Sequence, residues 1–96
     1  MIYHLVWFKM KEGATATDRE ELAAGLNGMI PHISEIQELA VGEDFSGRSH
    51  GFEVGLLVKC QSRADLDIYA VHPKHLEFIQ SCKHLWQEVR ALDFES

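Results

Sequence analysis

Residues 2–10 (IYHLVWFKM) predict a strand that is apolar on both faces, and this feature limits the folds open to the chain. Alternate residues fall into two largely apolar sets: Ile2, His4, Val6, Phe8 and Met10, and Tyr3, Leu5, Trp7 and Lys9. A sheet that helices cover on one side only presents a polar second face to water. This strand therefore predicts that both faces of its sheet are covered.

The size and charge of the chain narrow the class of protein. Its 96 residues suffice for one domain, residues 1–96, and 46% hydrophobic and 25% charged residues are ordinary globular values. The net charge is −6 with only nine Lys and Arg residues, so we expect no nucleic acid partner. The first residues lack a basic signal region and no apolar run could span a bilayer, so we expect a cytoplasmic protein without a membrane partner.

The cysteines and histidines do not form a metal-binding pattern. Cys60 and Cys82 are far apart with no CxxC arrangement, and we expect both to be buried thiols. His72 and His75 are three residues apart and could share a helix face, but no HExxH or CxxC pair supports them. We therefore expect no metal site.

The segment after the first strand has a helical pattern. Thr17-Asp18-Arg19-Glu20 is interpreted as a capping box, and Pro31 is expected to end the helix or nearly so. Apolar residues continue between them at helical spacing: Leu22, Leu26, Met29, Ile30 and Ile33. Residues 36–45 then indicate a moderately polar strand, and residues 46–51 have the composition of an exposed loop.

The second half of the chain predicts a strand, two short helices and a last strand. Residues 52–60 alternate, with one face formed by Phe52, Val54, Leu56, Val58 and Cys60. Ser62 begins a capping pattern for a helix through Tyr69, and Pro73 is expected at the first position of a further helix. That helix would carry Leu76, Phe78, Ile79 and Cys82. Residues 86–94 predict a closing strand, although residues 86–90 could equally extend the helix.

The resulting order, β-α-β-β-α-β, predicts an α+β protein with the ferredoxin-like arrangement, in which two helices cover one face of a four-stranded antiparallel sheet. The other face would then be bare, and it would carry Tyr3, Leu5, Trp7 and Leu57. A monomer seldom exposes so large an apolar patch, so we expect a two-fold homodimer.

The segment from Tyr69 to His75 (YAVHPKH) offers the clearest chemistry. His75 can exchange a proton near neutral pH and Tyr69 can donate a hydrogen bond, which makes the two a candidate acid/base site. Alternatively, His75 is a core residue that accepts the Tyr69 hydroxyl and fixes helix packing. His72 precedes Pro73 and is interpreted as a helix-start residue.

These features together resemble the stress-responsive A/B barrel (Dabb) domain family, part of the dimeric α+β barrel superfamily. The resemblance rests on residues 4–9 (HLVWFK), on Ile30-Pro31, and on Tyr69-x-x-His72-Pro73-x-His75 followed by Phe78 and Trp86. It implies a ferredoxin-like monomer whose sheet packs against that of a second copy to form a dimeric α+β barrel.

Within this family the chain is similar to plant cyclases that close a linear polyketide by aldol condensation without a cofactor. The resemblance implies catalytic roles for Tyr69 and His75 and a pocket role for His4. It also implies substrate-binding positions at Val6, Phe8, Phe78 and Trp86. The cyclase pocket has a tyrosine, a histidine and a glycine where this sequence has Ala23, Val54 and Ile79, which argues against a pocket of the same shape.

Three functions remain open from the sequence. The first is a small-molecule binder or enzyme, with cyclase or lyase chemistry on a carbonyl or aromatic compound, no cofactor, and His75 as the base. The second is a non-catalytic stress-response protein whose selected property is a stable dimer. The third is a monooxygenase or haem-degrading relative from the wider superfamily.

Overall fold

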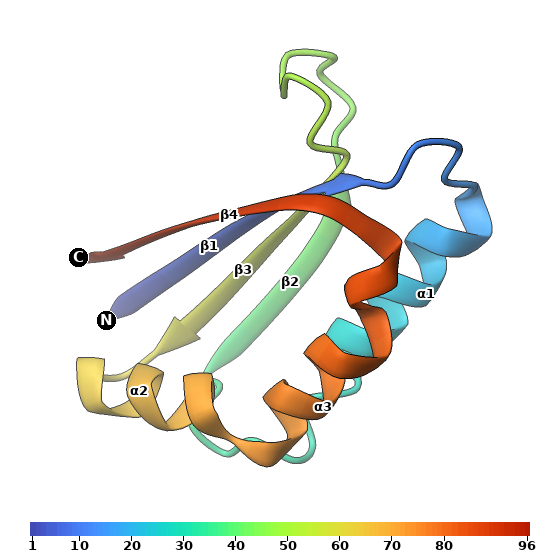
Figure 1. Ribbon diagram of the computed structural model, residues 1–96. Coiled ribbons are helices and arrows are strands. Elements are labelled where there is room, and N and C mark those ends of the chain that lie inside the picture. The colour runs from blue at the N-terminus through green and yellow to red at the C-terminus, as the bar shows by residue number, and fades with distance from the viewer.

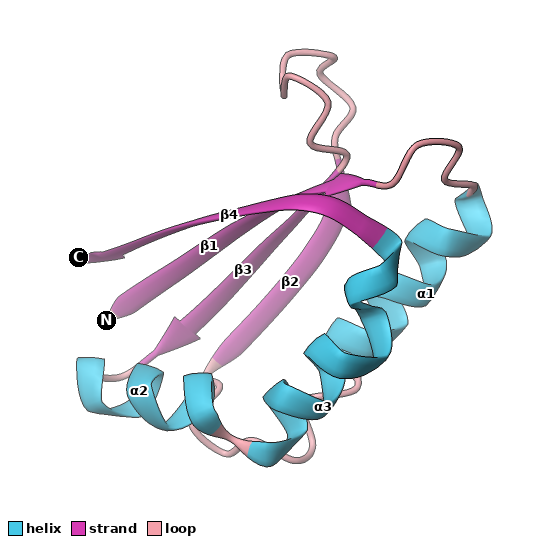
Figure 2. Cartoon of the chain, viewed as in Figure 1, coloured by secondary structure: helices cyan, strands magenta, loops and turns pink.

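The predicted order of strands and helices is confirmed, including the division of the second helical region into two helices. The computed structural model describes residues 1–96. Its elements are β1 (Ile2–Met10), α1 (Ala16–Asn27), β2 (Glu38–Glu43), β3 (Val54–Cys60), α2 (Arg63–Val71), α3 (Pro73–Cys82), a 3₁₀ turn (Lys83–Leu85) and β4 (Trp86–Glu95). The chain therefore has the α+β ferredoxin-like fold, with the helices on one side of the sheet (Figures 1 and 2).

The four strands form one antiparallel sheet in the order β2-β3-β1-β4. The apolar strand β1 lies between β3 and β4, where both of its edges are hydrogen-bonded. The register places Trp7 opposite Gly55 of β3 and Arg90 of β4. The two chain ends lie side by side (Figure 1), and the backbones of Met1 and Ser96 are joined by hydrogen bonds of 3.0 and 3.1 Å.

The core lies between the helices and one face of the sheet. This face carries the first of the two apolar sets of β1, together with alternate residues of β3, and the helices contribute Leu22, Leu26, Tyr69, Phe78 and Cys82. Both cysteines are free and buried, as predicted. The opposite face, which carries Tyr3, Leu5, Trp7 and Leu57, has no helix against it.

Helix α1 begins and ends earlier than the sequence pattern indicated. Its N-cap is Thr15, whose hydroxyl accepts from the backbone N–H of Asp18, and the Asp18 carboxylate accepts in return from the Thr15 N–H. The capping box therefore begins at Thr15 and not at Thr17. The helix ends at Asn27, before Pro31, because the chain turns at Gly28. Ile30 is consequently exposed, although Met29 and Ile33 remain buried.

The helical region after β3 follows its predicted capping signals. The Ser62 hydroxyl accepts from the backbone N–H of Asp65 at 3.1 Å and caps α2, and Pro73 occupies the first turn of α3. Of the apolar residues that α3 carries, Phe78 and Cys82 are buried and Leu76 is exposed. After the 3₁₀ turn, β4 extends to Glu95, so residues 86–90 belong to the strand and do not lengthen the helix.

The segment between β2 and β3 projects beyond the sheet as a long exposed loop (Figure 1). Both flanking strands are shorter than predicted. Phe52 lies before β3 and does not share the face of Val54. Its ring packs instead beneath the cationic groups of Lys9 and Arg90, each 5.3 Å from the ring centroid. These cation–π contacts hold the base of the loop on the face opposite the core.

Candidate functional site

A cavity of about 390 Å³ lies between the sheet and helices α2 and α3. Its volume is within the usual range of small-molecule sites. Seven of the residues that line it were candidates from the sequence: His4, Val6, Phe8, Tyr69, His75, Phe78 and Trp86. The strand β1 supplies three of them and the α2–α3 region another three, because the helices cross over this strand and bring the two segments together.

Tyr69 and His75 stack against each other across the α2–α3 junction. Their ring centroids are 4.6 Å apart with an interplanar angle of 35°. The prediction for this pair is a hydrogen bond made directly or through one water, and the direct bond is absent. The Nδ1 atom of His75 lies 2.9 Å from the carbonyl oxygen of Ala70 instead. Since a carbonyl only accepts, Nδ1 carries the proton and the neutral ring keeps its lone pair on Nε2.

Burial of the ring lowers the pKa of His75 below its ordinary value. The bond to Ala70 opposes this effect, while the nearby His4 and His72 reinforce it. His75 is therefore neutral at physiological pH. A neutral imidazole with a fixed tautomer and a free Nε2 has the properties of a general base.

The Tyr69 side chain is 1% exposed, and burial raises its pKa, with Cys60 adding a smaller effect. The phenol is thus protonated throughout the physiological range. Its hydroxyl makes no hydrogen bond within the chain. Since every fully buried side-chain oxygen and nitrogen has a partner, the Tyr69 hydroxyl oxygen is not fully buried. The hydroxyl oxygen therefore reaches the cavity, where it is free to donate to a bound molecule.

His4 forms a second polar group in the cavity wall. Its Nδ1 lies 2.5 Å from Oδ1 of Asp93, which faces it across the β1–β4 register. Its ring also meets the edge of Tyr69, with centroids 5.6 Å apart. The sequence reasoning did not identify Asp93. Aligning β4 against β1 as an antiparallel pair could have done so, because Asp93 is an acidic residue on the face that packs against the helices.

Aromatic rings form the other end of the cavity. Trp86 contacts both Phe8 and Phe78, with centroid separations of 5.0 and 5.9 Å. Ile79 lines the cavity, whereas Ala23 and Val54 do not. Of the three positions that distinguish the sequence from the cyclase pattern, only Ile79 therefore shapes the space that is present.

His72 has the helix-start role predicted for it. Its Nδ1 accepts the backbone N–H of Lys74 at 3.0 Å and so caps α3. No group of three or more potential ligand side chains of His, Cys, Asp or Glu converges anywhere in the structure. None of the helices combines the length and the apolar character that crossing a membrane requires.

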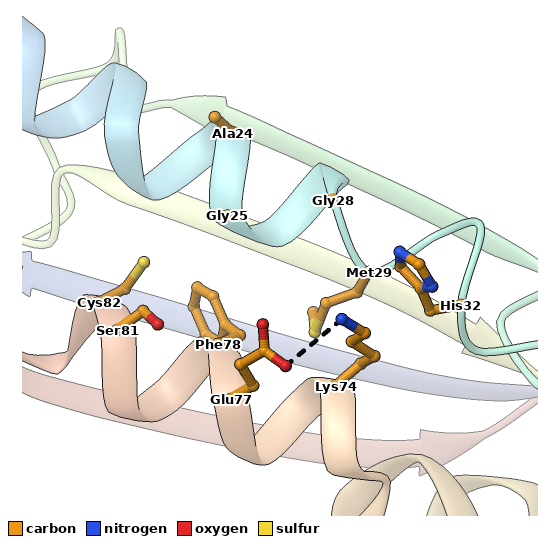
Figure 3. Close-up of a pocket in the computed structure, with 10 residues that line it drawn as sticks. All are labelled: Ala24, Gly25, Gly28, Met29, His32, Lys74, Glu77, Phe78, Ser81 and Cys82. Atoms are coloured by element: carbon orange, nitrogen blue, oxygen red, sulfur yellow. Dashed lines mark hydrogen bonds and ion pairs between the residues drawn. The ribbon is translucent and has the colours of Figure 1, made fainter.

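A second hollow, of about 290 Å³, lies on the outer surface between α1 and α3 (Figure 3). Small residues of α1 let the helices approach: a Cβ on Gly25 would lie 2.9 Å from the Sγ of Cys82 and 3.1 Å from the Phe78 ring. At its rim, Lys74 and Glu77 already form an ion pair of 3.4 Å. The hollow is explained by helix packing, and we assign it no ligand.

Comparison with known proteins places this geometry in a family. The model of the family described as "Stress responsive A/B Barrel Domain" matches residues 2–96. None of the curated proteins matches the sequence.

Three solved structures illustrate the breadth of the likeness. A dimeric ferredoxin-like protein of unknown function from Jannaschia sp. is 29% identical, with 99% of this chain and 98% of that chain covered and a TM-score of 0.76. A dimeric protein of unknown function from Bacteroides fragilis is 18% identical, with coverages of 99% and 95% and a TM-score of 0.83. The hydroxynitrile lyase of Passiflora edulis is 20% identical, with coverages of 97% and 90% and a TM-score of 0.86.

Proposed function

The chain belongs to the stress-responsive A/B barrel domain family, and on that premise we propose that it binds a small, largely apolar carbonyl compound and acts on it by cofactor-independent acid/base chemistry. One observation carries this proposal: a neutral His75 with its Nδ1 proton held by Ala70 lines an apolar cavity beside an unpaired Tyr69 hydroxyl. A base and a hydrogen-bond donor are thus available to the same bound molecule.

In the proposed reaction, Nε2 of His75 takes a proton from the carbon next to the carbonyl. The electron pair of the broken C–H bond forms the enolate C=C bond, and negative charge moves to the carbonyl oxygen. The Tyr69 hydroxyl donates a hydrogen bond to that oxygen. The enolate carbon then attacks a second carbonyl carbon in an aldol step. The π bond of that carbonyl opens to an alkoxide, which takes the proton from the His75 imidazolium. Alternatively, the enolate carbon regains that proton itself.

His4 and Asp93 have a supporting role in this proposal. The Asp93 carboxylate accepts the Nδ1 proton of His4 at 2.5 Å and fixes the tautomer of the ring, so that Nε2 is left as an acceptor. This second imidazole can hold a substrate hydroxyl or receive a proton from it. The cavity thus contains two histidines whose orientations are set by different partners, a backbone carbonyl and a carboxylate.

The expected ligand class follows from the cavity wall and from the relatives. Ten of the thirteen lining residues are hydrophobic, which favours an aromatic or alkyl body with few polar groups. Tyr69 and His75 stand where plant olivetolic acid cyclase, which this chain resembles, has its catalytic tyrosine and histidine. Hydroxynitriles are a further class to test, because a hydroxynitrile lyase shares the fold.

Tryptophan fluorescence tests the proposal directly, because Trp86 lines the cavity and Trp7 lies on the opposite face. The probes are aromatic ketones, polyketide lactones and hydroxynitriles. We expect saturable quenching in wild type and in Trp7→Phe, and none in Trp86→Phe. A bound ketone should also exchange its α-proton for deuterium, as followed by NMR, and His75→Asn should remove this exchange. Binding without exchange would favour the non-catalytic alternative.

We also propose that the protein is a homodimer that closes over the helix-free face of its sheet. Trp7 is 38% exposed there, and Leu92 and Phe94 of β4 add two further apolar side chains to the same face. Burial of such a patch favours association. Two of the solved relatives are themselves dimeric ferredoxin-like proteins.

A further inference from the structure

The helix-free face of the sheet, here called the open face, has small residues on one half and large ones on the other. The register sets four residues side by side across the strand order: Gly42 of β2, Gly55 of β3, Trp7 of β1 and Arg90 of β4. The two glycines leave a hollow of about 410 Å³, whose lining is mostly hydrophobic and includes Trp7. A shallow hollow and a large indole therefore lie next to each other at the same level of the sheet.

Nothing within the chain requires glycine at these two positions. Neither Gly42 nor Gly55 has a positive φ, and a Cβ at either position would meet no atom within 4 Å. Glycine weakens a strand interior, because it loses more backbone entropy on folding and offers no side chain to pack. Two of them, paired across β2 and β3, indicate that the space above them is used by something outside the chain.

We propose that a second copy of this chain uses it: Trp7 of each copy seats in the Gly42–Gly55 hollow of the other. This inference rests on the homodimer proposed above. It places the two-fold axis along the midline of the sheet, between β3 and β1 and parallel to the strands. Rotation about that line brings β1 of one copy over β3 of the other at the same level, so that Trp7 faces Gly55 in both directions.

The neighbouring row of residues fits the same axis. At the next level of the open face the order is Ala40, Leu57, Leu5 and Leu92. The midline axis sets Leu5 against Leu57 and the large Leu92 against the small Ala40. The first row thus pairs each large side chain with a glycine. The second row pairs Leu92 with an alanine and Leu5 with another leucine, so no two bulky rings oppose each other between the two sheets.

The charges of the open face favour the midline axis over the alternative axis, which would lie in the interface and run across the strands. The alternative axis would stack Trp7 on Tyr3 and set both glycines against the ion pair of Lys59 and Glu38, whose separation is 2.9 Å. Moving both charges into an apolar hollow would be costly. The midline axis leaves them at the rim and sets one charged group over Gly42, that of Arg90 on the edge strand β4, which is well exposed and paired with Glu88 at 2.8 Å.

Mixing two complementary variants tests this arrangement. Trp7→Ala removes the large side chain, and Gly42→Val/Gly55→Val fills the hollow. Each variant alone should dimerise at least tenfold more weakly than wild type while keeping its circular dichroism spectrum. In an equimolar mixture the heterodimer should exceed its random share by native mass spectrometry, because Trp7 of the valine variant enters the empty hollow and the valines fill the space left by the other indole.

Ile68→Ala is the matched control, since Ile68 is an exposed residue of α2, away from the open face, and its mixture with wild type should be random. If the valine variant does not fold, Gly42→Ala/Gly55→Ala replaces it. Random pairing of the two complementary variants, with wild type dimeric, would overturn the Trp7 docking alone. A monomeric wild type would overturn the homodimer itself.

Discussion

His75 and His4 are the two imidazoles that the fold brings to one cavity, and they differ in what holds their Nδ1 atoms. For His75 the partner is a neutral carbonyl, which fixes the tautomer without adding negative charge. For His4 it is the carboxylate of Asp93, which holds the ring from the neighbouring strand β4. We therefore expect His75 to act as the neutral base and His4 to orient the substrate.

Tyr69→Phe separates the binding role of the hydroxyl from its structural role. The hydroxyl bonds to nothing within the chain, so its loss should cost less than about 1 kcal/mol of stability, since no hydrogen bond is broken. The same change should weaken ligand binding about tenfold or more, equivalent to about 1.4 kcal/mol. Thermal melts and fluorescence titrations of one preparation measure both. A melting point several degrees lower would indicate that the hydroxyl is architectural.

His75→Asn should change how stability depends on pH. The pKa of His75 in the folded protein is lower than in the unfolded chain, where it is about 6.5. As the pH falls through this window the unfolded chain binds the proton first, so the free energy of unfolding decreases. The stabilisation is complete above about pH 6.5 and is lost below the folded-state pKa.

Urea unfolding between about pH 7.5 and 5.5 measures this effect. His75→Asn should show a shallower decrease than wild type, because the other histidines titrate in both proteins and cancel in the comparison. Identical slopes for the two proteins would contradict the half-buried, neutral state of His75.

At the scale of elements, the junction between α2 and α3 positions both His75 and Tyr69. His72 has extended backbone, ends α2 and caps α3 through its Nδ1, and Pro73 then starts the new helix. The break lets α3 leave in a new direction, so that His75 turns back onto Ala70 and Tyr69. An uninterrupted helix would not bring these groups together in this way.

His72→Ala should remove the cap of α3. Loss of a side-chain N-cap costs about 0.5–2 kcal/mol, which should lower the melting point by several degrees in a domain of this size. His72→Asn should restore most of the loss, because its side-chain oxygen can accept the same backbone N–H. Equal melting points for His72→Ala and wild type would show that this cap adds nothing.

Sequence patterns predicted the elements that depend on local chemistry. The two apolar faces of residues 2–10, the Ser62 cap and the helix start at Pro73 all follow from neighbouring residues, and the structure confirms them. Thr15 was missed in favour of Thr17 because each threonine is followed three residues later by an acidic residue, Asp18 after Thr15 and Glu20 after Thr17. Phe52 was assigned to β3 because the alternation of residue types continues on the N-terminal side of Val54, where the strand begins.

The unpredicted parts of the site depend on contacts between distant segments. The hydrogen bond of His4 to Asp93 joins the first and last strands, and it becomes visible only once their register is known. The cavity itself could be anticipated from family likeness but not its volume, which depends on how Ile79 and Trp86 pack. The tilted contact between the rings of Tyr69 and His75, without a direct hydrogen bond, likewise depends on helix geometry.

At the scale of the whole molecule, the two faces of one sheet have separate tasks. One face and the helices enclose the cavity. The other face has no helix against it and is the proposed dimer surface. Because β1 contributes His4 to the first face and Trp7 to the second, a dimer would hold this strand in place from both sides.

Trp7→Glu should therefore abolish dimers and leave the cavity formed. A carboxylate in the middle of an apolar interface loses its water without gaining a partner, which is far more costly than the loss of the indole contacts. The wild-type contact should be of standard size, burying about 1,600 Å² or more in total. Size-exclusion chromatography with light scattering at micromolar concentration should give the mass of two chains for wild type and of one for the variant.

Trp7→Phe, which keeps an aromatic ring, should remain dimeric. Trp7→Glu should still show quenching of Trp86 by ligand, since the cavity lies on the other face of the sheet. Loss of quenching in a folded Trp7→Glu monomer would mean that the site depends on the second chain, and the two faces would then act together.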